Sequence, residues 1–346
     1  MSFRAVPLER AALALGRREA ALLVALALLS IALFMASLAV GHAALPFFDA
    51  LGDLVSGEES LEAMILREIR LPRTVLGLGV GASLGLTGAA LQGWLRNPLA
   101  EPALVGVSAS AALGAVLVFY FGAVAVAPVT LPLGGLAGAF VAVLLIQLLA
   151  GRFGGPFTLI LAGVAVNSLA AALTALALSL APNPFAVTEI LFWLLGSLAD
   201  RSLEHVALAL PLMALGWLVL LSLGRALDAL TLGEDVARSL GVDLGRFRLR
   251  LIAGAALCVG ASVSVAGSIG FVGLVVPHLL RPLCGHRPGF LLPASALGGA
   301  ALTLAADIAV RLAVGAAGEL RLGVFTALIG APFFLWLVVK ARRQAL

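Results

Sequence analysis

Long apolar runs, separated by short stretches that contain proline, glycine or charged residues, follow one another along almost the whole chain. Most of these runs hold about 20 residues and few charges, which is the length that a helix needs to cross the hydrocarbon core of a bilayer. The pattern therefore predicts an all-α polytopic membrane protein with ten transmembrane helices. The predicted spans are residues 20–41, 72–95, 103–121, 128–150, 157–181, 203–223, 248–267, 269–285, 290–314 and 320–340.

The amino-acid composition agrees with this pattern and argues against a soluble globular protein. Hydrophobic residues make up 62% of the 346 residues and charged residues only 12%, too little polar material to coat a soluble globule of this size. A net charge of +4 would suit nucleic acid in a soluble protein, but here the basic residues mostly collect at the ends of the spans. We therefore expect membrane lipid around the chain and no nucleic acid bound to it.

The first run follows Arg17 and Arg18 and is longer than the apolar core of a secretory signal peptide. It is interpreted as the first span, with a cytoplasmic N-terminus. An even number of spans then places both termini in the cytoplasm, together with the charged residues 225–250. A minority of the basic residues falls outside, against the positive-inside trend, and invites a functional interpretation: Arg67, Arg70, Arg73, Arg201, Arg311 and Arg321.

Residues 225–250 are densely charged and lie between two apolar runs. Thr231 and Glu234 have the spacing of a capping box, Arg238 lies toward the C-terminal end, and Gly241 suits the position after a helix. These signals predict a rigid helix of two to three turns that projects into water; a merely solvated loop is the alternative. Its apolar residues would offer a small face to a partner: Val236, Ala237 and Leu240.

Two parts of the chain repeat one another, with a glycine and a proline in register. The matched residues are Val80–Ser83 with Val259–Ser262, Gly88 with Gly267, Pro98 with Pro277 and Arg67 with Arg246. The second and seventh predicted spans contain these matches, and they cross the membrane in opposite directions. We therefore predict an inverted-topology repeat, with halves at about 67–200 and 246–340, within one transmembrane domain that covers residues 1–346.

A short apolar segment follows Pro182 and Pro184, between the fifth and sixth spans. It is too short to cross a bilayer, so we expect a half-helix at the outer face, where neighbouring protein satisfies its backbone. A loop with an interfacial aromatic anchor at Trp193 is the alternative.

The sequence shows no motif for binding ATP or a catalytic zinc ion. No GxxxxGK[ST] or HExxH occurs, and Lys340 is the only lysine, so the chain has no P-loop for ATP. Cys258 and Cys284 form no CxxC, and His278 is interpreted as a core or helix-end histidine rather than a metal ligand. We therefore predict no catalytic residue, no metal site and no cofactor bound by this chain.

Asp307 and Arg311 are spaced i, i+4 within the ninth span, where a mutual ion pair is expected. A proton relay would need more intramembrane carboxylates than this one. An ion-coupled secondary transporter, which would also fit inverted repeats and a broken helix, is therefore the alternative rather than the first hypothesis.

Four stretches together resemble the permease family of ABC importers for iron-siderophores, haem and vitamin B12. They are RLPRTVLGLGVGASLGLTGAALQGWLRNPLAEPALVGVS at 70–108, LTLGEDVARSLGV at 230–242, SVAGSIGFVGLVVPHLLR at 264–281 and GVFTALIGAPFFLW at 323–336. The resemblance covers nearly the whole chain. It implies a homodimer of ten-span subunits in the inner (plasma) membrane, docked to two cytoplasmic ATPases that use ATP and Mg, and served by an extracytoplasmic binding protein.

The resemblance also implies roles for particular residues. The segment 225–247 becomes the element that couples to the ATPase, through Glu234, Asp235, Val236, Ala237, Arg238, Leu240 and Gly241. An outer pocket that receives glutamates of the binding protein falls on Arg70, Arg73 and Arg311. The inner gate and the pathway fall on Asn97, Leu99, Pro156, Phe157 and Asn167. One departure is Arg321, where family members commonly have proline.

These expectations describe an all-α permease that moves a bulky metal chelate into the cytoplasm. A ferric siderophore is the first expectation for the substrate, and haem and cobalamin follow closely. A pathway lined by small and aliphatic residues offers few specific contacts, so the binding protein is expected to do most of the selecting.

Overall fold

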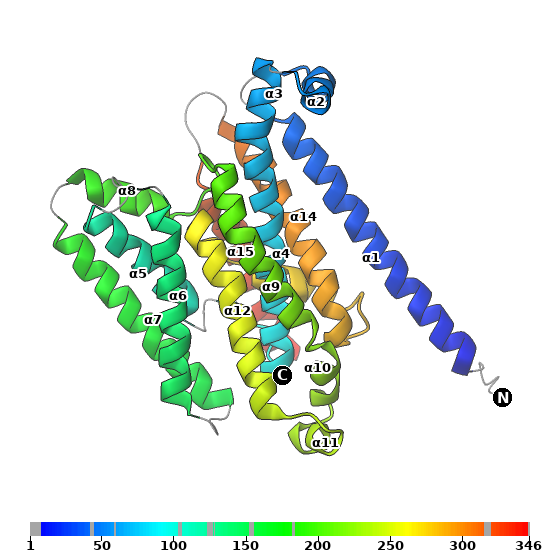
Figure 1. The fold of residues 1–346 in the computed structure, drawn as a ribbon. Helices are drawn as coiled ribbons and strands as arrows, with labels where there is room; N and C mark the ends of the chain where they lie inside the picture. Colours follow the sequence, from blue (N-terminus) through cyan, green and yellow to red (C-terminus); the bar gives the residue numbers. More distant parts are fainter. Residues whose placement is uncertain are drawn as a thin grey trace.

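The computed structural model describes residues 8–41, 45–58, 60–102, 106–122, 127, 129–151, 156–181, 184–314 and 320–344 (Figure 1). These residues form helices and turns, and no strand occurs among them. In chain order the helices are α1 (Leu8–Ala39), α2 (Phe47–Ser56), α3 (Leu61–Ile65), the π-helical turn η1 (Leu66–Arg70), α4 (Leu71–Leu95), α5 (Val107–Tyr120), α6 (Thr130–Ala150), α7 (Pro156–Ser179), α8 (Pro184–Leu194), α9 (Leu203–Leu221), α10 (Gly224–Leu230), α11 (Glu234–Ser239), α12 (Leu244–Ala266), α13 (Val272–Leu280), α14 (Pro288–Val314) and α15 (Leu322–Gln344). The predicted all-α class is confirmed.

Seven helical segments in the described part of the chain are long and apolar enough to cross a membrane. They are Gly16–Ala39, Leu61–Leu95, Thr130–Leu149, Phe157–Ser179, Leu203–Leu221, Leu244–Ala266 and Pro288–Ala313. Two shorter apolar helices, Val107–Tyr120 and Leu322–Leu337, correspond to the third and tenth predicted spans. The predicted number of ten transmembrane helices is therefore not confirmed in detail.

The eighth predicted span, 269–285, is wrong, because α13 has only nine residues. The chain leaves α12 at Gly267, which has a φ of 69°, and enters α13 after Phe271, which has a φ of 67°. The backbone N–H of Ser197 donates to the Ala266 carbonyl at 2.8 Å, so groups beside the break are satisfied from a distant segment. Non-helical backbone at membrane depth is tolerated where protein surrounds it in this way.

Helix α4 is the central helix, and nearly all of it is buried (Figure 1). Its glycines allow backbones of α14 and α13 to approach so closely that an added methyl group would overlap a carbonyl oxygen. The close pairs are Gly81 with Gly299, Gly85 with Ser295, and Gly88 with Gly273. This arrangement agrees with the expectation that small residues place the second span at the centre of the bundle.

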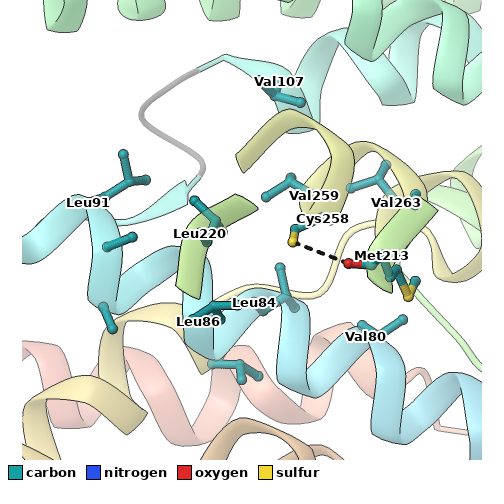
Figure 2. Packing of buried hydrophobic residues seen from close by; sticks show 14 of the residues in the cluster. Val80, Leu84, Leu86, Leu91, Val107, Met213, Leu220, Cys258, Val259 and Val263 are labelled. Carbon is teal, nitrogen blue, oxygen red and sulfur yellow. Dashed lines mark hydrogen bonds between the residues drawn. The ribbon is translucent and has the colours of Figure 1, made fainter. Parts of the chain in front are cut away.

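The remaining helices form two groups around α4. Helices α5, α6, α7 and α8 lie together on one side and meet the rest mainly through α12 (Figure 1). Helix α1 leans against α14 on the other side and exposes much of its apolar surface. Figure 2 shows side chains of α4, α9 and α12 packed into one core, among them Val80, Leu84, Met213, Leu220, Cys258 and Val259.

The end of the molecule opposite α11 carries helices that the sequence did not predict. Helices α2 and α3 precede α4, and η1 joins α3 to α4 as a π-helical turn, so residues 61–95 form one nearly continuous helix. The short helix α8 confirms the predicted half-helix, and its Trp193 is buried rather than an exposed interfacial anchor.

The direction of the helices fits the predicted repeat. Helices α4 and α12, which contain the matched sequences, run in opposite directions (Figure 1). Helix α1 begins and α15 ends toward the end of the molecule where α10 and α11 lie. The inverted repeat and the cytoplasmic side of both termini stay predictions.

The glycine seam of α4 gives a first testable prediction. Gly85→Ala should lower the free energy of unfolding by about 1–3 kcal/mol, because the new methyl group would overlap the Ser295 carbonyl and must push two helix backbones apart. Denaturant titration of the purified protein in detergent measures this change. Gly16→Ala, in α1, is the matched control because nothing lies within 4 Å of its added carbon. Equal stability of the two variants would contradict the seam.

Candidate functional site

Helices α10 and α11 form a small module that projects from the end of the bundle (Figure 1). Helix α11 has six residues, which is shorter than predicted. The predicted capping box is wrong: Gly233, with a φ of 115°, precedes the helix, and the Thr231 hydroxyl donates to the Asp228 carbonyl at 2.6 Å instead. The predicted stop at Gly241 is confirmed by its φ of 87°.

The outer face of α11 carries both apolar and charged side chains. Val236 is 43% exposed and Leu240 is 63% exposed. Ala237, predicted to share this face, is fully buried and instead anchors α11 to the hydrophobic core. The correction follows from helix geometry, because a helix that packs against the bundle must turn one side inward. Val236 and Leu240 therefore offer apolar surface that a partner could contact.

Ion pairs order the charged side chains of α11. Arg238 lies 3.2 Å from a Glu234 oxygen and 2.6 Å from an Asp235 oxygen, within the helix. Arg248 of α12 reaches the same Glu234 carboxylate at 3.5 Å. Exposed pairs of this kind add little to stability, but they fix the positions of the charges.

The module is fastened to three long helices. The Arg96 guanidinium at the end of α4 donates to the Leu230 carbonyl, the last residue of α10. The Asp228 carboxylate accepts the Gly289 N–H at 2.8 Å and so caps the beginning of α14. On the other side, Arg248 of α12 contacts α11. A force applied to α11 would therefore reach α4, α12 and α14 together.

The sequence predictions missed this fastening. Arg96 and Asp228 were not singled out, because their partners lie far away along the chain. The Asp228 carboxylate lies at the start of α14, but no local sequence pattern reveals this. Only the folded chain brings these residues together.

The predicted gate residues lie in separate places. Asn97 forms a tight turn after α4, in which its side-chain oxygen accepts the Leu99 N–H at 2.9 Å. Phe157 is 72% exposed near the beginning of α7; Pro156 begins that helix, and the preceding residues 152–155 lie outside the described part of the chain. Asn167 is half-buried about three helical turns further along α7, beside the start of α5.

The three outer arginines predicted for docking are engaged inside the molecule. Arg73 makes a two-pronged contact with the Asp307 carboxylate at 2.8–3.1 Å, and Arg311 lies 3.0 Å from the same carboxylate. The expected Asp307–Arg311 pair is confirmed. Arg70 and Arg311 are only 4% and 6% exposed, so the expectation of an open surface pocket does not match this conformation.

The same arginines hold the end of α1. Arg70 donates to the carbonyls of Leu38 and Ala39 at 2.8 and 2.7 Å, and Arg311 donates to those of Ser37 and Val40 at 2.9 and 2.6 Å. The last carbonyls of a helix have no partner within it, and positive charge favours this end of the helix dipole. The cluster therefore caps α1, a role that the sequence did not reveal.

Two further predicted residues have aromatic neighbours. His278 packs edge-on against Phe333, with ring centroids 5.8 Å apart, and among the described residues no group of three His, Cys, Asp or Glu side chains could hold a metal. Arg321, where the sequence departs from the family pattern, lies over the Phe192 ring at 5.1 Å. Arg321 is therefore a link between α8 and the start of α15.

Comparisons with a protein-family model and with known sequences all match this chain to transport permeases. Residues 28–340 match the model of the FecCD transport family. The chain is 42% identical to the vitamin B12 import system permease of Vibrio cholerae, over 82% of this chain and 86% of the relative. It is also 42% identical to the cobalamin import system permease of Halobacterium salinarum, over 82% of this chain and 75% of the relative.

A solved structure gives the same result at the level of the fold. It is described as an inward-facing conformation of a metal-chelate type ABC transporter, and it is 33% identical in sequence. The match covers 92% of this chain and 98% of the other, with a TM-score of 0.81.

The arginine cluster at the end of α1 gives a second prediction. Asp307→Asn should lower the free energy of unfolding by about 3–5 kcal/mol, because the buried Arg311 and the partly buried Arg73 would lose their carboxylate. Thermal unfolding of the purified protein in nanodiscs measures the loss. Asp49→Asn, on the exposed part of α2, is the control and should change stability by at most about 0.5 kcal/mol. A small effect of Asp307→Asn would show that the cluster is not needed for stability.

Proposed function

Because the chain belongs to the FecCD transport family, we propose that it is the permease of an ATP-driven importer that carries cobalamin or a related corrinoid inward. The broader function, a membrane permease of the metal-chelate and vitamin B12 class of ABC importers, follows from the family and its relatives. Two relatives at 42% identity are named for vitamin B12 or cobalamin, which moves cobalamin ahead of the ferric siderophore expected from the sequence. Ferric siderophores and haem remain the next candidates.

One structural observation supports ATP-driven transport: the fastening of the α10–α11 module to α4, α12 and α14. Two ATPases that close on ATP would push on α11 from the cytoplasm. Since the module cannot move independently of these helices, the push would become a rigid-body motion of the bundle. ATP and Mg belong to the partner ATPases, and the permease itself transmits the motion.

The ion-coupled alternative finds no support at Asp307, a carboxylate within a predicted span. Asp307 lies within the predicted ninth span, and both Arg73 and Arg311 contact it. The Asp307 carboxylate is already engaged by two guanidiniums, so it is not open to a transported cation. This observation favours ATP as the energy source.

We expect a homodimer with its pathway between the two copies, lined by α7, α8 and α15. These helices expose large apolar side chains, which would let a bulky chelate pass with few polar contacts: Leu161, Leu169, Phe185, Phe192, Leu328 and Ile329. Docking of a binding protein on Arg70, Arg73 and Arg311 would require its carboxylates to replace Asp307 or the carbonyls of α1.

The coupling role of α11 gives a third prediction. The double variant Val236→Asp/Leu240→Asp should weaken binding of the partner ATPase by about tenfold or more, because both side chains are exposed and would place charges in an apolar contact. Binding of the ATPase to the permease in nanodiscs measures the change. Val55→Asp, an exposed position on α2, is the control at the opposite end of the molecule. Equal affinity of all three proteins would remove α11 as the docking element.

The substrate is tested by uptake. Proteoliposomes that contain the permease, its ATPases and its binding protein should accumulate radiolabelled cobalamin only when ATP is inside with the ATPases. Uptake of a ferric siderophore or of haem under the same conditions, without cobalamin uptake, would correct the substrate but keep the importer. Uptake driven by a proton or sodium gradient without ATP would overturn the proposed function.

A further inference from the structure

The carboxylate of Glu101 lies at the beginning of the broken helix α13. Its Oε1 accepts the Phe271 N–H at 2.8 Å. Phe271 precedes the first residue of α13, so its N–H has no partner within the helix, and a carboxylate suits this end of the helix dipole. Burial raises the pKa of the Glu101 carboxyl, while the hydrogen bond from Phe271 opposes that rise. The surroundings are otherwise apolar and include Leu91, Trp94, Ile146, Leu159 and Ile252.

Phe271 connects this bond to another helix. Its backbone is left-handed, with a φ of 67°, a conformation that a bulky residue keeps only when its surroundings hold it. Its ring lies against Gly330 of α15, so closely that any side chain at Gly330 would overlap the ring. Phe271 is thus held by Glu101 on its backbone and packed against α15 through its side chain.

Glu101 also ends the short turn that contains the proposed gate residues. Asn97 accepts the N–H groups of Leu99 and Ala100, through its side-chain oxygen and its carbonyl respectively. Directly after Glu101, Pro102 packs on Gly273 of α13, where an added carbon would lie 2.8 Å from the proline ring. The turn after α4 is therefore attached to α13 at two successive residues.

On the basis of the proposed function, we propose that Glu101 is a positioning residue of the inner gate. Its carboxylate fixes residues 97–101 to the start of α13 and holds Phe271 against α15. The gate turn and the pathway helix α15 then move as one unit. Loss of the carboxylate would let the turn open without α15, so that ATP hydrolysis would continue while less substrate is carried for each ATP.

Hydrogen–deuterium exchange on the full chain in nanodiscs tests the link itself. Glu101→Ala should speed exchange around Phe271 by about tenfold or more, because the Phe271 N–H loses its acceptor. Glu101→Gln keeps an amide oxygen as acceptor and should stay within about threefold of wild type. Glu58→Ala, an exposed outer position, is the control. Unchanged exchange in Glu101→Ala would overturn the role of Glu101.

Uptake by the reconstituted complex tests the positioning role. With labelled cobalamin as the probe, the ratio of uptake to ATP hydrolysed should fall several-fold in Glu101→Ala, and Glu101→Gln should restore most of it. Gly330→Ala should produce the same fall by displacing Phe271, and the double variant should be no worse than the more severe single variant, because both act through Phe271. An unchanged ratio, or fully additive losses, would overturn the role of Glu101 in the gate.

The two experiments separate this inference from the proposed function. Absence of ATP-driven uptake by the wild-type complex would overturn the proposed function. Unchanged exchange in Glu101→Ala would overturn the inference even if wild-type uptake is normal. A fold defect would show as faster exchange throughout the chain, and Glu101→Gln, which keeps the acceptor, then decides whether the bond or the fold is responsible.

Discussion

The fold depends on one constraint: polar backbone groups inside a bilayer must find partners within the protein. Uninterrupted helices meet it automatically, but this chain breaks or ends helices in the interior, and each break has its own solution. The end of α1 is satisfied by Arg70 and Arg311, the end of α12 by the Ser197 N–H, and the start of α13 by Glu101. At each of these places, a group from another segment of the chain supplies the partner that the helix itself lacks.

The same constraint sets the condition under which a membrane transport protein tolerates irregular helices: other parts of the protein must satisfy the freed backbone groups. A break such as the one between α12 and α13 gives the bundle a place to bend, and identifiable hydrogen bonds from Ser197 and to Glu101 hold the backbone on its two sides. The cytoplasmic module uses a related solution, because Asp228 and Arg96 satisfy helix ends while they join α10 to α14 and α4. Hydrogen bonds at helix termini thus stabilise the helix ends and also connect one helix to the next, so that the connected helices would move together.

Sequence reasoning recovered the features that depend on neighbours along the chain. Hydropathy gave the helical class and most spans, Gly241 gave the end of α11, and the glycines of α4 gave its central place. Sequence reasoning failed where a contact with a residue far away along the chain determines the position of a side chain. The Thr231 hydroxyl bonds backward to α10, Ala237 turns inward, and Arg73 reaches Asp307 from another helix. The hydropathy of 269–285 could not reveal that only nine of these residues form a helix, because apolar composition is the same in a full span and in a half-helix.

The π-helical turn at 66–70 has a consequence for how chains of this family could vary in length. Such a turn holds about one residue more than an α-helical turn, so it absorbs an extra residue without rotating the helix on either side. Ala63 is buried before the turn, and Thr74 and Leu76 are buried after it. Loss of a single residue from this turn during evolution would leave an ordinary α-helix whose buried faces before and after the turn are still aligned. A deletion within α4 itself would instead rotate its glycines away from α14.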